Sequence, residues 1–84
     1  MSVKAIVTIY DKKAEQENFF GLYANKLVAL RDFSEVCKDE KGMVKKYPED
    51  YEMHIIGYMD DKSGALRAEK ETIGQAIEYV KMGE

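Results

Sequence analysis

Hydrophobic and polar residues alternate along the first ten residues of the chain. Every second position from 3 to 9 is apolar, which gives a row made of Val3, Ala5, Val7 and Ile9. The other side is mixed and holds Lys4, Ile6, Thr8 and Tyr10. A period of two with many β-branched residues is typical of a strand that buries one face. We therefore predict a strand over residues 3–10.

Residues 14–24 follow without a clear period. They hold three aromatic residues, Phe19, Phe20 and Tyr23, together with Gly21. This composition leaves two structures open, an aromatic-bearing loop or a short extended piece.

A helical period begins after Asn25, a residue type that caps helix N-termini well. Apolar residues recur at i, i+1, i+4, i+7 and i+8 and form one stripe, made of Ala29, Leu30, Phe33, Val36 and Cys37. We predict a helix that runs to about Lys41 and packs this stripe on the sheet. Gly42 is expected just past its end, in a left-handed conformation.

Alternation returns after the turn at Tyr47–Asp50 and predicts a strand over residues 51–59. One face of that strand would carry Tyr51, Met53, Ile55 and Met59, and the other Glu52, His54, Ile56 and Tyr58. The run 60–64 ends in Gly64 and predicts a hairpin loop that leads into a strand over residues 65–69.

The last element is expected to be a short helix. Thr72 and Gln75 have the spacing of a capping box, and apolar residues recur behind them at Ile73, Ala76, Ile77 and Val80. The order β-α-β-β-α predicts one α+β domain over residues 1–84, a two-layer sandwich with a three-stranded, mostly antiparallel sheet. The long connection through the first helix would also allow the first strand to pair in parallel.

Length and cysteine content narrow the class of protein. A chain of 84 residues is enough for one domain with a thin core. Its single cysteine, Cys37, excludes an internal disulfide. The sequence shows neither a signal peptide nor about 18 consecutive apolar residues, so we expect no membrane contact and a cytoplasmic location.

The charge is mildly acidic and unevenly spread. The net charge is −3, with +2 over residues 1–46 and −5 over residues 47–84. Nonspecific duplex-DNA binders usually present a basic surface, so this class is disfavoured. The alternative explanation of this uneven charge distribution is an ordinary solvated surface with mixed charges.

The sequence offers little catalytic chemistry. It holds one histidine, His54, and no serine elbow, phosphate loop or paired-cysteine motif. A His54–Cys37 dyad is disfavoured because Cys37 falls on the apolar stripe of the helix, where a small buried hydrophobe is expected. The acidic pairs at 49–50 and 60–61 have the pattern of solvated turns rather than of a metal site. We expect no catalytic residue, no metal and no cofactor, and therefore no enzyme.

Two clusters combine aromatic residues with lysines, the combination that single-stranded nucleic acid needs. The candidate nucleic-acid-binding residues are Lys12, Lys13, Phe19, Phe20, Tyr23, Lys26, Lys45, Lys46 and Tyr47. Lys45 and Lys46 are the first candidates for phosphate contact, and Lys12 and Lys13 the next. The alternative for each cluster is aromatic residues in the core and lysines at a solvated rim.

The run Pro48-Glu49-Asp50-Tyr51, followed by Ile55-Ile56-Gly57-Tyr58, Asp60-Asp61 and Gly64, makes the segment from Phe19 to Gly64 distinctive. It resembles the small nonstructural protein of gokushovirus-type microviruses, which are tailless phages with circular single-stranded DNA. Tyr47 stands where that family typically has His, and the C-terminal segment does not fit its pattern. The resemblance implies a DNA-binding role in genome replication or packaging.

Two functions of different class follow. The first is single-stranded DNA binding by a phage nonstructural protein. The second is a non-enzymatic interaction or assembly module that binds a phage or host protein. In either case we predict a homodimer, because strand 51–59 has apolar residues on both faces and the helices cover only one. The competing explanation is that residues 19–23 fold over the second face.

Overall fold

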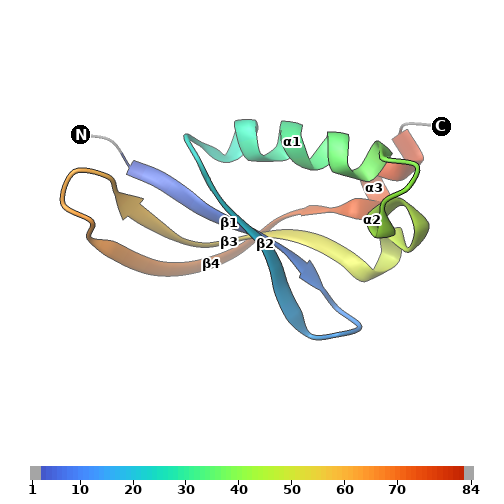
Figure 1. Cartoon of the computed structure of the whole chain (residues 1–84), viewed down its shortest axis with the longest axis horizontal. Coiled ribbons are helices and arrows are strands. Elements are labelled where there is room, and N and C mark those ends of the chain that lie inside the picture. The colour runs from blue at the N-terminus through green and yellow to red at the C-terminus, as the bar shows by residue number, and fades with distance from the viewer. Residues whose placement is uncertain (1–2, 83–84) are drawn as a thin grey trace.

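The computed structural model describes residues 3–82. Its strands are β1 (Val3–Asp11), β2 (Gln16–Tyr23), β3 (Tyr51–Asp60) and β4 (Leu66–Gln75). Its helices are α1 (Lys26–Lys38), α2 (Met43–Lys46), the 3-10 turn η1 (Pro48–Asp50) and α3 (Ala76–Met82). Figure 1 shows the helices in one layer above a twisted sheet, whose other face carries no helix. In this described part of the chain, no helix combines the length and apolar character needed to cross a membrane.

The sheet has four strands in the order β2-β1-β3-β4, and all neighbours are antiparallel. The α+β two-layer class is as predicted, but the three-stranded sheet is wrong, and so is the parallel pairing that the long connection seemed to allow. The extra strand is β2, and it lies in the segment 14–24 for which the sequence allows either a loop or an extended piece. The chain reverses directly after β1, because the Asp11 carboxylate accepts hydrogen bonds from the backbone N–H groups of Lys13 and Ala14 at 3.0 and 3.1 Å.

Strand β2 contains a β-bulge, which is why its sequence does not show the alternating pattern of a strand. Its register against β1 shifts between Val7 and Ile9, and Phe19 in the facing stretch has a positive φ of 56°. A bulge adds one residue to a strand and breaks the period of two. Residues 19–23 therefore lie beside β1 at the edge of the sheet, and the alternative in which they fold over its second face is wrong.

Helix α1 forms where the period predicted it. The Asn25 side chain accepts a hydrogen bond from the Val28 N–H at 3.0 Å, which confirms the N-cap. The helix ends earlier than predicted, at Lys38, because Asp39 takes an extended conformation. Gly42 has φ −83° and precedes α2, so its predicted left-handed role is wrong.

The core lies between α1 and the helix-facing side of the sheet. Its buried apolar residues are Ala5, Val7, Ile9, Ala29, Phe33, Cys37, Val44, Met53, Ile55 and Ala76. Phe33 is fully buried and meets the ring of Tyr79 edge-on at 5.5 Å between centroids. Three residues of the predicted stripe are buried, whereas Leu30 is half-buried and Val36 is exposed.

Strand β3 changes the direction of its side chains halfway along. Its register against β1 shifts so that Ile55 pairs with Val7 and Tyr58 pairs with Ala5, and Ile56 is the extra residue. Tyr58 therefore packs against the core instead of pointing away from it as predicted. The same shift turns Met59, opposite Lys4, away from the core, so the predicted second subunit stays a prediction.

Strand β4 is longer than predicted and runs through residues 66–75. Thr72 lies inside it opposite His54, so the predicted capping box is wrong. The pairing with β3 outweighs the local capping signal, and α3 begins only at Ala76. The hairpin loop between β3 and β4 is confirmed, since Gly64 has φ 77° and donates its N–H to the Asp60 carbonyl at 2.7 Å.

Candidate nucleic-acid interface

The predicted nucleic-acid-binding residues do not form one patch. They fall in three places: the β1–β2 hairpin, the start of α1, and α2 with the turn that follows it. Each place has its own partners, and these decide which side chains remain available to a ligand.

At the hairpin end, Lys13 and Tyr47 line one shallow hollow of about 500 Å³. Asp11, Glu49 and Asp50 line the same hollow. Three carboxylates beside one lysine repel a phosphate group, so this hollow is a poor phosphate site.

Tyr23 and Lys26, at the start of α1, are engaged within the protein. Tyr23 packs against the core, and burial, together with the Asp32 carboxylate beside it, raises the pKa of its hydroxyl. Lys26 donates to Glu71 of β4 at 2.7 Å, and this hydrogen bond raises the pKa of the lysine. Binding of nucleic acid by these two side chains stays a prediction.

Lys45 and Lys46 lie on α2, in the helix layer. The Lys45 ammonium is 2.5 Å from the Glu40 carboxylate, and that of Lys46 lies 5.5 Å from the centre of the Tyr47 ring. Because α2 belongs to the helix layer, these two lysines lie away from the sheet face that has no helix (Figure 1).

Phe19 and Phe20 are exposed, with 73% and 66% of their surface accessible. Gly21 pairs with the core residue Val7, so alternation places Phe20 on the helix-free face of the sheet. Phe19, inside the bulge, instead lines a groove on the helix side. Two residues adjacent in the sequence thus serve different surfaces.

The helix-free face, which we call the open face, carries a row of polar and aromatic side chains from all four strands. Tyr10 of β1 stacks on His54 of β3 with ring centres 4.8 Å apart and planes inclined by 18°. The ammonium group of Lys70, from β4, lies 5.4 Å from the centre of the Tyr10 ring and 3.4 Å from the Glu17 carboxylate. An aromatic ring and a solvent-exposed cation thus lie side by side on this face.

His54 is buried at 2% exposure between two carboxylates. Its Nδ1 lies 3.1 Å from both oxygens of Glu17, and its Nε2 lies 2.5 Å from Glu52. Each ring nitrogen thus faces a carboxylate, and the imidazole bridges Glu17 of β2 and Glu52 of its own strand.

Both carboxylates have lowered pKa values. Burial alone would raise the pKa of Glu17, but hydrogen bonds from Thr8 and His54, the charge of His54 and the contact with Lys70 outweigh it. Burial likewise opposes the change at Glu52, where His54, Gln75 and Lys12 lower the pKa. The acidic charge on the open face is thus matched locally by cations.

This cluster links β2, β3 and β4 through side-chain contacts. His54 has no open side from which to reach a substrate, and both of its nitrogens are already occupied. Cys37 lies elsewhere, fully buried under α1, and burial raises the pKa of its thiol to about 11. Residues 3–82 contain no group of three or more His, Cys, Asp or Glu side chains placed to hold a metal ion.

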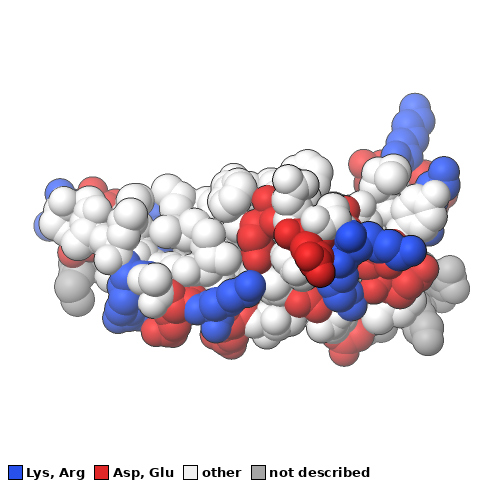
Figure 2. All heavy atoms as spheres, turned by 90° about the horizontal axis from the view of Figure 1, so that it is seen from below, with Lys and Arg blue, Asp and Glu red and all other residues white. Residues whose placement is uncertain are grey.

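Charge on the open side is mixed. Figure 2 shows lysines and acidic residues interspersed there, next to a broad area without charged side chains. A strand of nucleic acid would therefore meet separate cations and uncharged surface, not a continuous basic track.

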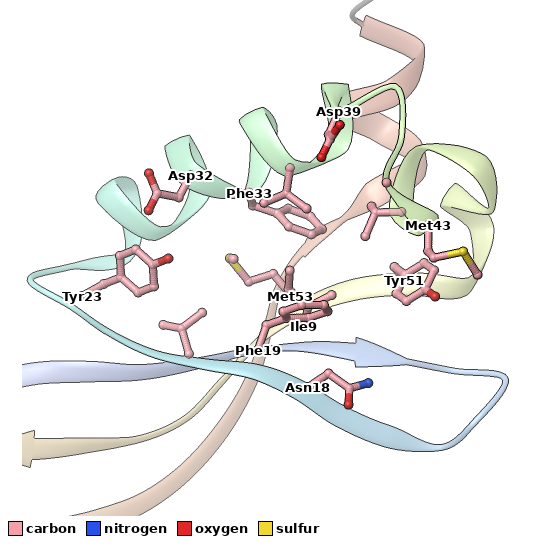
Figure 3. A pocket seen from close by; sticks show the side chains of 14 residues that line it. Ile9, Asn18, Phe19, Tyr23, Asp32, Phe33, Asp39, Met43, Tyr51 and Met53 are labelled. Carbon is pink, nitrogen blue, oxygen red and sulfur yellow. The ribbon is translucent and has the colours of Figure 1, made fainter.

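A groove on the helix side opens beside β2. It has a volume of about 610 Å³ and lies between α1 and strands β1–β3. Val7 is one of its apolar lining residues. Figure 3 shows Ile9, Met53 and Phe19 below Phe33, with Tyr23 and Asp32 to one side. The groove resembles the preformed apolar sites that take a ligand or a partner's side chain.

Sequence reasoning missed the open-face members Tyr10, Glu17 and Lys70. The alternation of the first strand puts Tyr10 on its mixed side, but no local pattern shows that Lys70 lies over its ring. Only the register of four strands joins residues 53 positions apart, such as Glu17 and Lys70. The exposed aromatic residues of segment 19–23 were the usable signal.

Comparison with known proteins gives one result. A protein-family model described as Phage ORF5 protein matches residues 4–79, which are 76 of the 84 residues. No curated protein and no solved structure matches the chain. The phage origin implied by the motif series around Pro48 is thus confirmed at the level of the family, and the chain belongs to the phage ORF5 protein family.

Proposed function

We propose that this phage protein is a non-enzymatic single-stranded-DNA-binding protein that binds the nucleic acid on its open face and acts in genome replication or packaging in a microvirus-type phage. The observation that carries the proposal is the row of Phe20, Tyr10 and Lys70 across a sheet face that no helix covers. Aromatic residues on a four-stranded sheet are a common platform for unstacked bases.

Each member of the row has a defined part. Phe20, at 66% exposure, offers a free ring for a base. Lys70 has 63% of its side chain exposed and can exchange the Glu17 carboxylate and the Tyr10 ring for a phosphate, which leaves Tyr10 free to stack. Lys12 lies at the same face, 3.8 Å from Glu52. Stacking with few phosphate contacts gives modest affinity, in keeping with a net charge of −3.

The test is fluorescence anisotropy of a labelled single-stranded oligonucleotide at about 50 mM salt, where electrostatic binding is strongest. Phe20→Ala should weaken binding by about 5- to 150-fold, which corresponds to one lost base stack. Leu27→Ala is the matched control, because Leu27 is also exposed and apolar but lies on α1. No saturable binding by the wild type at high micromolar protein would refute the proposal.

The salt dependence of binding locates the phosphate contacts. Replacing Lys12 and Lys70 with Ala should flatten the slope of log K against log salt by about one unit per lost contact. Replacing Lys45 and Lys46 removes the same charge from α2. If the slope changed only in this second variant, the phosphate contacts would be made by Lys45 and Lys46, as the sequence first suggested.

A second candidate function is a module that binds a phage or host protein. The groove beside β2 favours it, because an apolar site of about 610 Å³ suits a protein side chain better than a phosphate backbone. Pull-down of one stoichiometric partner by the wild type, lost in a groove variant such as Val36→Lys, would support this function.

A further inference from the structure

We infer that β2 and the groove beside it form a homodimer interface, in which a second copy of the chain pairs along the β2 edge and places its Phe19 in the groove. The proposal does not rest on DNA binding. It rests on the contrast between the two edges of the sheet and on the position of the groove.

The two edge strands differ in their protection. Strand β4 carries Arg67, Glu69, Lys70 and Glu71, and charged residues on an edge discourage pairing with another chain. Strand β2 contains a single charged residue, Glu17, which is turned into the His54 cluster. Its backbone edge is free, and exposed apolar side chains flank it at Phe19, Phe20 and Leu22.

The β2 edge is also self-complementary. A twofold contact requires that a projecting group and the hollow that receives it lie on the same surface of one chain. Phe19 is 73% exposed in the bulge, and it lines the groove from the side of β2 (Figure 3).

Size and charge favour a second copy over a foreign partner. The chain exposes 5605 Å², and a standard interface takes about 800 Å² per partner, roughly a seventh of that surface. The exposed apolar residues beside the groove, Met43 and Val36 among them, would supply much of this area. Pairing β2 with β2 brings together strands that hold one neutralised charge each, so like-charge repulsion between two acidic chains is small.

The dimer would join two four-stranded sheets into one continuous sheet of eight strands. The open faces of the two copies would then lie on the same side of this sheet, because antiparallel pairing of the edge strands continues the sheet. Such an arrangement leaves Phe20 and Lys70 of both copies accessible while it buries Phe19.

The experiment is light scattering coupled to size exclusion, without DNA, over a range of micromolar concentrations. The wild type should have a mass of about 19 kDa, twice the 9.7 kDa of one chain. Phe19→Asn should shift the mass toward 9.7 kDa. Asparagine tolerates the positive φ at this position, so the variant should fold, which its circular dichroism and melting curve would verify.

Leu66→Lys is the matched control, since Leu66 is 70% exposed on the opposite edge strand and its replacement should leave the mass unchanged. A wild-type mass of one chain at every concentration would overturn the dimer and leave the groove to a foreign segment. A dimer that persists in Phe19→Asn but dissociates in Leu66→Lys would overturn the assignment to β2. Because DNA is absent, these outcomes are independent of the DNA-binding test.

Discussion

Gly57 lies in β3 at the point where the backbone of β4 comes closest. A Cβ atom at this position would lie 2.5 Å from the carbonyl oxygen of Arg67 and 3.5 Å from the Cα of Ala68. Protein Cβ atoms essentially never come closer than 3.0 Å to another heavy atom, so Gly57→Ala must push the strands apart by at least about 0.5 Å. The obstructing atom is backbone and cannot rotate away as a side chain could.

The cost can be worked from this displacement. Overpacking of a well-packed site costs about 1–3 kcal/mol, and one weakened ladder hydrogen bond adds about 0.5–1.5 kcal/mol. We expect Gly57→Ala to lower the free energy of unfolding by about 2–4 kcal/mol. The whole stability of a domain this size is roughly 4–13 kcal/mol, so the variant should melt roughly 8–30 °C lower.

The assay is urea unfolding followed by far-ultraviolet circular dichroism, with midpoint and slope fitted separately. Gly21→Ala is the matched control in another strand. Its Cβ would meet only the ring of Tyr23 at 3.2 Å, and this ring can shift. We expect the control to stay within about 0.5 kcal/mol of the wild type. Equal stability of the two variants would show that β3 and β4 are not in this register.

Three further outcomes follow from the buried groups. Phe33→Ala should cost about 3–5 kcal/mol by urea unfolding, and a variant that melts like the wild type would place Phe33 on the surface. Cys37→Ser should destabilise less and leave DNA binding intact, and the native thiol, with its pKa raised to about 11, should react with Ellman's reagent at pH 8 only after unfolding. Glu17 and Glu52 have pKa values below the usual 4.5 when folded, so their stabilisation is complete above about pH 4.5 and is lost as the pH falls through the lowered values. Unfolding curves from pH 6 to pH 2 should show this loss, and Glu17→Gln should reduce it.

Helix α1 could be predicted from the sequence because its signals are local. The Asn25 cap acts within three residues, and the stripe through Phe33 and Cys37 follows a period of 3.6 residues that needs no knowledge of the sheet. Its C-terminus was placed three residues too late, where Asp39 rather than Gly42 ends the helix. Periodicity gives the position of a helix better than its last turn.

The fourth strand and the faces of β3 could not be predicted in the same way. Whether a residue such as Ile56 is an extra residue in its strand depends on the register of two partners that are distant in sequence. One extra residue reverses all later side chains, which is why Tyr58 changed face. The open-face cluster has the same origin, since Glu17 and His54 are 37 positions apart and meet only after β2, β1 and β3 align.

The bulge in β2 gives one short strand two separate surfaces. Neighbouring side chains of a strand point to opposite faces, with or without a bulge between them and their partners. In a regular β2, Phe19 would therefore lie on the helix-facing side, in the row of side chains next to the core residues of β1. The positive φ at Phe19 frees its ring to stand at the groove mouth, while Phe20 keeps its place on the open face.

The proposed dimer and the proposed DNA platform should therefore respond to different variants. Phe20→Ala should lower DNA affinity at unchanged mass. Phe19→Asn should lower the mass, and it should weaken binding only to oligonucleotides long enough to span both copies, because it removes avidity and not a contact. If Phe19→Asn weakened binding equally for short and long oligonucleotides, Phe19 itself would contact DNA, and the division of β2 into two surfaces would be wrong.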